Sequence, residues 1–74
     1  MILNRISVDP LVMTGKPCIK GTRVTVGAIV GQMATGSTFQ ELLDEYPYLK
    51  KEDILQALQF AAYRVDEQEV ALQA

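Results

Sequence analysis

The sequence contains no histidine, no tryptophan and a single cysteine among its 74 residues. Without histidine, the chain lacks the base of most Ser-His and Cys-His nucleophilic pairs and the commonest zinc ligand. A single cysteine excludes an intrachain disulfide, so Cys18 is interpreted as a reduced, packed thiol, and a reactive thiolate beside Lys16 and Lys20 is the alternative. We therefore expect no enzyme activity, no metal and no cofactor.

Long hydrophobic runs are also missing. The longest apolar stretch, residues 24–30, is interrupted by Thr25 and Gly27 and is far shorter than the roughly 20 residues that a membrane span requires. The first ten residues have neither the apolar segment nor the small-residue cleavage site of a secretory signal. We therefore expect a cytoplasmic protein with no membrane partner.

The composition, 49% hydrophobic and 22% charged, is typical of a globular protein and not of a disordered chain. Residues 1–74 are enough for a single domain with one small core. Such a domain buries only about 60% of the surface that its unfolded chain exposes, so a second subunit would stabilise it. We expect a homodimer.

The charges divide the chain into a basic half and an acidic half. Residues 1–36 carry four basic side chains and one acidic one, a net charge of +3, whereas residues 37–74 carry three basic and eight acidic ones, a net charge of −5. Because the whole chain has a net charge of −2, any contact with nucleic-acid phosphates must come from local basic positions.

Residues 1–25 have the pattern of a short β segment. Residues 6–8 alternate apolar and polar side chains and stop at Asp9 and Pro10, which is typical of an edge strand. A second strand is predicted at residues 18–19, followed by a hairpin in which Gly21 provides a positive φ. Because such short strands are marginally stable alone, we predict that this segment forms the dimer interface through its free edges.

Residues 26–74 predict a three-helix bundle with a C-terminal tail. Thr25 is the expected N-cap of the first helix, whose apolar residues recur at helical spacing until Gly36. Gly27 and Gly31 lie four residues apart in this helix and predict the close approach of another backbone.

The second and third helices are separated by a short connection. A capping box of Ser37 and Gln40 is expected to begin the second helix, which ends before Pro47. The third helix is predicted over residues 51–70, with Lys50 in place of the usual small polar N-cap.

The third helix has an apolar stripe and a polar outer face. The stripe consists of Ile54, Leu58, Ala61 and Val65. The predicted outer face holds Glu52, Gln56, Gln59, Phe60 and Tyr63, and the acids of the first turn, Glu52 and Asp53, are interpreted as solvated.

The short helix, turn and longer helix after residue 36 match a helix-turn-helix pair, with the preceding helix as its third member. On DNA, Lys50 and Lys51 would contact phosphates, and Gln56 and Gln59 would hydrogen-bond adenine edges. Many three-helix domains bind no DNA, so a purely structural role is the alternative.

The runs ISVDP, GKPCIKGTRVTV and STFQELLDEYPYLKKEDILQALQFAAYR resemble, in order and spacing, the bacterial domain of unknown function 433 over nearly the whole chain. The resemblance implies a homeodomain-like three-helix fold behind an N-terminal β segment. It also implies a small antitoxin encoded beside a PIN-like nuclease. Among the matched positions, Arg23 is a candidate DNA contact, and an ion pair with Asp44 or Glu45 is its alternative use.

We predict a homodimeric antitoxin that is also the DNA-binding autorepressor of its operon, with half-sites about one helical turn apart. The third helix and the tail over residues 63–74 are expected to bind the PIN-like nuclease through Phe60, Tyr63, Val70 and Leu72, although the tail is alternatively a frayed helix end. The alternative function is a protein-interaction module of the same fold with no role on DNA.

Overall fold

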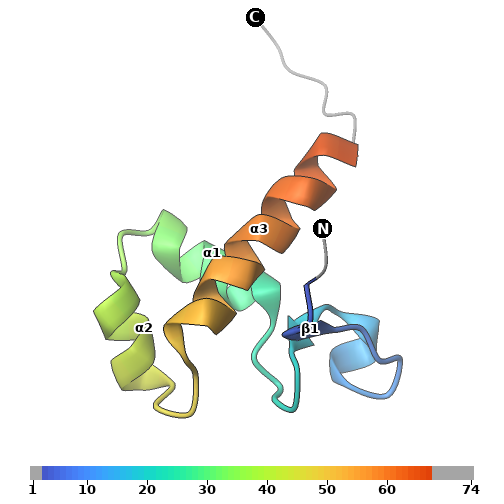
Figure 1. Cartoon of the computed structure of the whole chain (residues 1–74), viewed down its shortest axis with the longest axis horizontal. Coiled ribbons are helices and arrows are strands. Elements are labelled where there is room, and N and C mark those ends of the chain that lie inside the picture. Colours follow the sequence, from blue (N-terminus) through green and yellow to red (C-terminus); the bar gives the residue numbers. More distant parts are fainter. Residues whose placement is uncertain (1–2, 68–74) are drawn as a thin grey trace, which may run out of the picture.

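The computed structural model describes residues 3–67. In these residues a small β segment is followed along the chain by three helices (Figure 1). The elements, in order, are β1 (Ile6–Ser7), the 3-10 turn η1 (Met13–Gly15), β2 (Cys18–Ile19), α1 (Val26–Ala34), α2 (Phe39–Glu45) and α3 (Lys51–Glu67). The mostly helical class and the preceding β segment are therefore confirmed. None of the helices in residues 3–67 has the length and apolar character that a membrane crossing requires.

The β segment is a two-stranded antiparallel sheet. Ile6 pairs with Ile19 and Ser7 pairs with Cys18, while Cys18 also forms an isolated bridge with Thr25 on its other side. The predicted turn after β2 is present, with Gly21 at φ +80°. β2 thus lies between β1 and the start of α1, and Cys18 is buried as a packed thiol.

Helix α1 begins and ends at the predicted residues. The Thr25 hydroxyl accepts a hydrogen bond from the backbone N–H of Ala28 at 3.0 Å. At the other end, Gly36 has φ +103°, and the Ser37 N–H donates to the Gln32 carbonyl at 3.0 Å, which closes the last turn.

The capping box of α2 lies one residue later than predicted. Thr38 and Glu41 form it: the Glu41 N–H donates to the Thr38 hydroxyl at 3.1 Å, and the Thr38 N–H donates to the Glu41 carboxylate at 3.0 Å. Ser37 is not the cap because its backbone N–H closes α1, as described above. The Gln40 side chain instead donates to Asp44 on the same helix.

Helix α3 is capped by its own third residue. The backbone N–H of Lys50 donates to Asp53 Oδ2 at 2.8 Å, which is the bond that the third helical residue makes back to the N-cap in a capping box. The other half, an N-cap side chain that accepts from the first turn, is what Lys50 does not provide. Asp53 Oδ1 accepts from Arg5 Nη1 at 2.9 Å. Asp53 is 5% exposed, so the prediction that it is a solvated acid was wrong.

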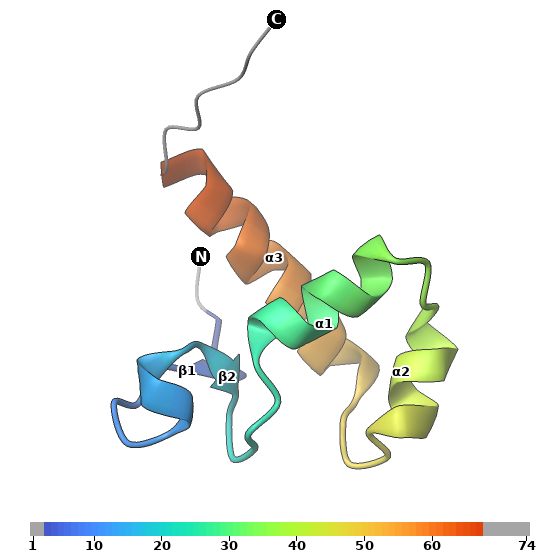
Figure 2. The same cartoon turned by 180° about the vertical axis from the view of Figure 1, so that it is seen from behind.

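The core lies where the three helices meet, around the fully buried Ile29, Leu42 and Ile54 (Figure 2). Helix α1 makes the most extensive contact with α3, and β1 contacts α3 as well. Because α3 has neighbours on two sides, its covered arc is wider than the predicted stripe. Phe60, predicted on the outer face, packs against the core, whereas Val65 of the predicted stripe is exposed.

The predicted close approach at Gly27 and Gly31 was also wrong. A Cβ placed on either glycine has no heavy atom of another side chain or element of residues 3–67 within 4 Å. Both residues therefore face open space on the surface of α1.

Candidate nucleic-acid interface

Two turns bring exposed basic side chains to one end of the molecule. The turn after β2, residues 20–23, and the turn between α2 and α3, residues 46–50, both reach the lower end of the molecule in Figures 1 and 2. A shared open pocket lined by Gly21, Thr22, Arg23 and Tyr48 joins the two turns. We call the exposed residues Lys20, Arg23, Tyr48, Lys50 and Lys51 the basic end.

The first turn presents Arg23 from a fixed backbone. The Thr22 hydroxyl donates to the Ile19 carbonyl at 2.8 Å and accepts from the Val24 N–H at 3.0 Å. The predicted alternative, an ion pair of Arg23 with Asp44 or Glu45, is not formed, since the one ion pair within residues 3–67 joins Arg5 and Asp53. Arg23 is therefore exposed and available to a phosphate.

The second turn places Lys50 and Lys51 at the start of α3. The backbone of Lys50 is held by Asp53, and its side chain is exposed. The Lys51 ammonium lies 5.7 Å from the centroid of the Phe39 ring. Both positive charges stand beside the exposed Glu52, the acid nearest to them in the sequence.

The two predicted base-reading glutamines differ in their surroundings. Gln56 Oε1 accepts from the backbone N–H of Arg5 at 2.9 Å, and its Nε2 donates to Asn4 Oδ1 at 2.9 Å. The amide of Gln56 is thus used inside the domain, because the N-terminal segment covers this face of α3. Gln59 and Leu55 are exposed.

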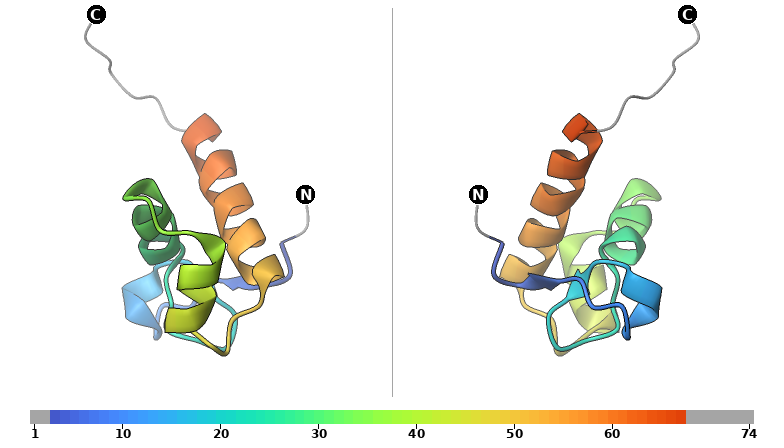
Figure 3. Two further views of the ribbon diagram at one scale, coloured as in Figure 1. Left: turned by 90° about the vertical axis from the view of Figure 1, so that its left-hand side faces the viewer. Right: turned by 90° about the vertical axis from the view of Figure 1, so that its right-hand side faces the viewer.

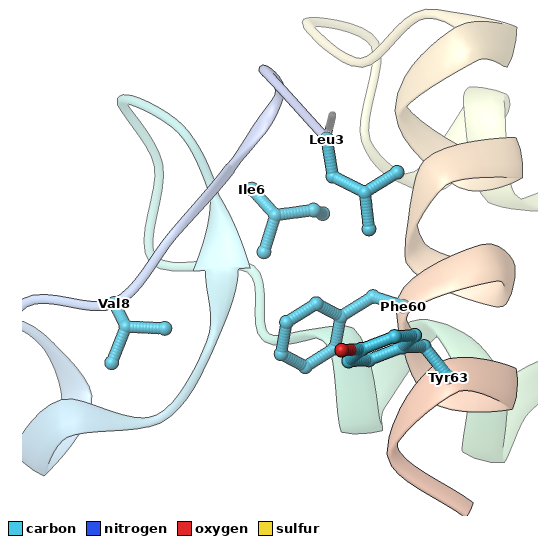
Figure 4. Close-up of a pocket in the computed structure, with 5 residues that line it drawn as sticks. All are labelled: Leu3, Ile6, Val8, Phe60 and Tyr63. Atoms are coloured by element: carbon cyan, nitrogen blue, oxygen red, sulfur yellow. The ribbon is translucent and has the colours of Figure 1, made fainter. Parts of the chain in front are cut away.

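A second candidate surface is an apolar pocket between the N-terminal segment and the C-terminal half of α3. It has a volume of about 300 Å³ and is lined by Leu3, Ile6, Val8, Phe60 and Tyr63 (Figure 4). Val8 is 59% exposed and Tyr63 is 55% exposed, although both side chains are largely apolar. The apolar alternation of Ile6 and Val8 is the sequence signal for this wall of the pocket, and the helical spacing within α3 does not contain it.

Two charged side chains of α3 stand beside the aromatic residues of this pocket. The Arg64 guanidinium lies 5.7 Å from the centroid of the Phe60 ring. A hydrogen bond to Glu67 and the charge of that carboxylate raise the pKa of Tyr63 above its ordinary value. The pocket is thus flanked by one positive and one negative charge.

The predicted partner contacts Val70 and Leu72 lie outside the described residues. Within residues 3–67, no three acidic or cysteine side chains are arranged to hold a metal ion.

Comparisons with known proteins find one family and one solved structure of high similarity. The family described as "Protein of unknown function (DUF433)" matches residues 6–61. The crystal structure of a DUF433 member protein from Anabaena variabilis is similar to this chain with a TM-score of 0.82 and 31% sequence identity. The similarity covers 86% of this chain and 63% of that protein, so this chain spans less than two thirds of its length. No curated protein matches this chain.

Proposed function

The chain belongs to the DUF433 family, and from this premise we propose that it is an antitoxin that neutralises a PIN-like nuclease and represses its own operon by binding DNA. In this proposal, α2, the following turn and α3 act as a homeodomain-like helix-turn-helix. The observation that carries the proposal is the basic end. Four of the seven Lys and Arg residues of a chain with net charge −2 lie there, Lys20, Arg23 and Lys50 on the two turns and Lys51 at the first position of α3.

The N-terminal half of α3 is the proposed reading element. At 100° per residue, Lys51, Leu55 and Gln59 share one exposed face of the helix. In the major groove, Gln59 would hydrogen-bond an adenine edge and Leu55 would contact a thymine methyl group. Glu52 on the same side would accept from a cytosine amino group, which offsets its repulsion of the phosphates.

Phosphate contacts are assigned to the cations on both sides of this element. Lys50 and Lys51 flank the helix start, and Arg23 stands on the neighbouring turn, joined to it by the pocket with Tyr48. The residues on either side of Arg23 are joined by the bond from the Val24 N–H to the Thr22 hydroxyl, and the Lys50 N–H donates to Asp53. A phosphate would therefore bind two side chains whose backbone positions are held by hydrogen bonds within the domain.

The nuclease contact is assigned to the other end of α3. Residues 62–67 are all exposed, and this end of the helix extends beyond α1 and β1 (Figure 3). Val65 is 62% exposed there and is followed by two acidic residues, Asp66 and Glu67. An apolar side chain next to carboxylates fits the basic surface of an enzyme that binds nucleic acid.

The DNA-binding part is tested by fluorescence anisotropy with a single half-site from the chain's own promoter. The double variant Lys50→Ala and Lys51→Ala is expected to weaken binding at least tenfold, whereas the control Arg64→Ala, at the far end of α3, is expected to bind normally. Equal binding by the double variant and the wild type would contradict the proposal that α3 contacts DNA.

The antitoxin part is tested by co-expression with the nuclease encoded next to it. Growth inhibition by the nuclease is expected to disappear with the wild-type chain and to persist with the double variant Val65→Lys and Asp66→Lys. Failure of the wild-type chain to restore growth would contradict neutralisation.

A second candidate function is a protein-interaction module with no role on DNA. The apolar pocket and the acidic end of α3 favour it, because neither feature suits a nucleic acid. Neutralisation of the nuclease without any salt-dependent affinity for DNA would identify this function.

A further inference from the structure

We propose that the apolar pocket formed by Leu3, Ile6, Val8, Phe60 and Tyr63 is the site where a second copy of this chain docks, in a two-fold symmetric dimer. The inference deepens the proposed function, on which it rests in one respect: a repressor that reads paired half-sites needs two copies. In this dimer the two copies pack side chains of β1 and α3 against each other, whereas the sequence predicted that they pair the free edges of their strands.

The pocket is continuous with the core. Ile6 and Phe60 line it and also pack against the buried core cluster, so they join the two regions. Figure 4 shows the side chains of Leu3, Ile6, Phe60 and Tyr63 directed toward one space, with Val8 at its far side. An apolar side chain from a second copy would extend the core, to which residues 3–67 contribute nine buried hydrophobic side chains.

The charges beside the pocket favour a second copy over a partner of one charge sign. Arg64 and Glu67 lie one helical turn apart on α3, next to Phe60 and Tyr63 respectively. In the proposed dimer the two-fold axis passes close to these two side chains, so that Arg64 of each copy would face Glu67 of the other and the patch would complement itself. The phosphates of a nucleic acid would be repelled by Glu67, and the positive charges of a strongly basic protein would be repelled by Arg64.

The position of the pocket allows a dimer and DNA to bind at the same time. Phe60 lies nine residues after Lys51, a distance of about 13 Å along the helix axis. The basic end is at the start of α3, and the pocket is at the side of its second half. Pairing through the pocket therefore leaves both basic ends uncovered. In this account Phe60, Tyr63, Arg64 and Glu67 serve the second copy, and the nuclease contact is left to Val65 and Asp66, which lie on the opposite side of α3 at 100° per residue.

The experiment measures the mass of the full chain by sedimentation velocity from about 1 to about 100 µM, without DNA. The wild type is expected to reach twice the 8.2 kDa chain mass. Val8→Lys places a charge in the pocket at a residue that is 59% exposed, so it is expected to give the mass of one chain with an unchanged circular dichroism spectrum. The matched control is Leu11→Lys, because Leu11 is 92% exposed and does not line the pocket, and this variant is expected to remain dimeric.

A charge exchange tests the symmetry. Arg64→Glu and Glu67→Arg are each expected to weaken the dimer at least threefold, and the two together are expected to restore it, since each copy then carries the reversed pair. A monomeric wild type at every concentration, or a dimer unaffected by Val8→Lys, would overturn the proposal. So would a double charge variant that is no better than the single ones.

The two proposals fail separately. Monomeric Val8→Lys is expected to bind a single half-site like the wild type. If the wild-type chain binds no DNA, the mass measurement still decides the dimer, and if the chain is monomeric, the half-site measurement still decides the DNA contact.

Discussion

The guanidinium of Arg5 donates to the carboxylate of Asp53 at 2.9 Å, across 48 residues of sequence. The other oxygen of the same carboxylate accepts from the backbone N–H of Lys50 at 2.8 Å. One buried side chain thus both begins α3 and attaches the N-terminal segment to it. Since Lys50 and Lys51 belong to the proposed DNA contact, this carboxylate also fixes where their backbone lies.

Asp53→Ala is expected to lower the free energy of unfolding by about 2 kcal/mol, because α3 loses its cap and Arg5 loses its partner. The matched control is Glu52→Ala, an exposed acid of the same helical turn, for which a change of less than about 0.5 kcal/mol is expected. Urea unfolding followed by circular dichroism measures both. Equal effects would contradict the capping role of Asp53.

The ion pair itself is expected to contribute less than the cap. The Arg5 side chain is 35% exposed, so solvent screens the pair, and a double-mutant cycle of Arg5→Ala and Asp53→Ala should give a coupling energy of about 1 kcal/mol or less. A coupling energy as large as the whole effect of Asp53→Ala would show that the ion pair, and not the cap, dominates.

Thr38→Ala is expected to lower the free energy of unfolding by about 1 kcal/mol, because it removes the hydroxyl half of the capping box of α2. Ser37→Ala is the neighbouring control and is expected to change the stability by less than about 0.5 kcal/mol, since Ser37 closes α1 with its backbone N–H. A larger loss of stability in Ser37→Ala than in Thr38→Ala, again in urea unfolding, would show that Ser37 is the N-cap of α2.

Gly27→Ala and Gly31→Ala are each expected to raise the free energy of unfolding by about 0.5 to 1 kcal/mol. Both residues lie inside α1, where alanine is the better helix former, and an added Cβ has open space. Gly36→Ala is the contrasting control, because φ +103° is strained for any side chain, and it is expected to lower the melting temperature. Destabilisation by either α1 variant would mean that an unseen neighbour packs against that surface.

Local sequence signals predicted the local structure well. Thr25 and Gly36 mark both ends of α1 because a cap hydroxyl and a positive φ act within one helical turn. The cap of α2 was misplaced by one residue because Ser37 and Thr38 carry the same chemistry. Only the closing bond of α1, a backbone bond from Ser37 to Gln32, decides between them.

The surroundings of α3 depend on contacts between distant residues and were harder to predict. Gln56 and Phe60 fall on a face that the helical period alone leaves to solvent, yet Arg5 and Ile6 of the N-terminal segment cover it. Asp53 was predicted to be a solvated acid for the same reason, because its partner Arg5 lies far away in the sequence. The spacing of residues along one helix contains no information about a segment that begins some 50 residues earlier.

The measurement that tests the central claim most directly is the dependence of DNA affinity on salt. The three cations assigned to phosphates, Arg23, Lys50 and Lys51, predict that log K falls with log salt with a slope of about −3, and that Lys50→Ala with Lys51→Ala brings the slope to about −1. A flat salt dependence, or the same slope in the double variant, would contradict a DNA interface at the start of α3.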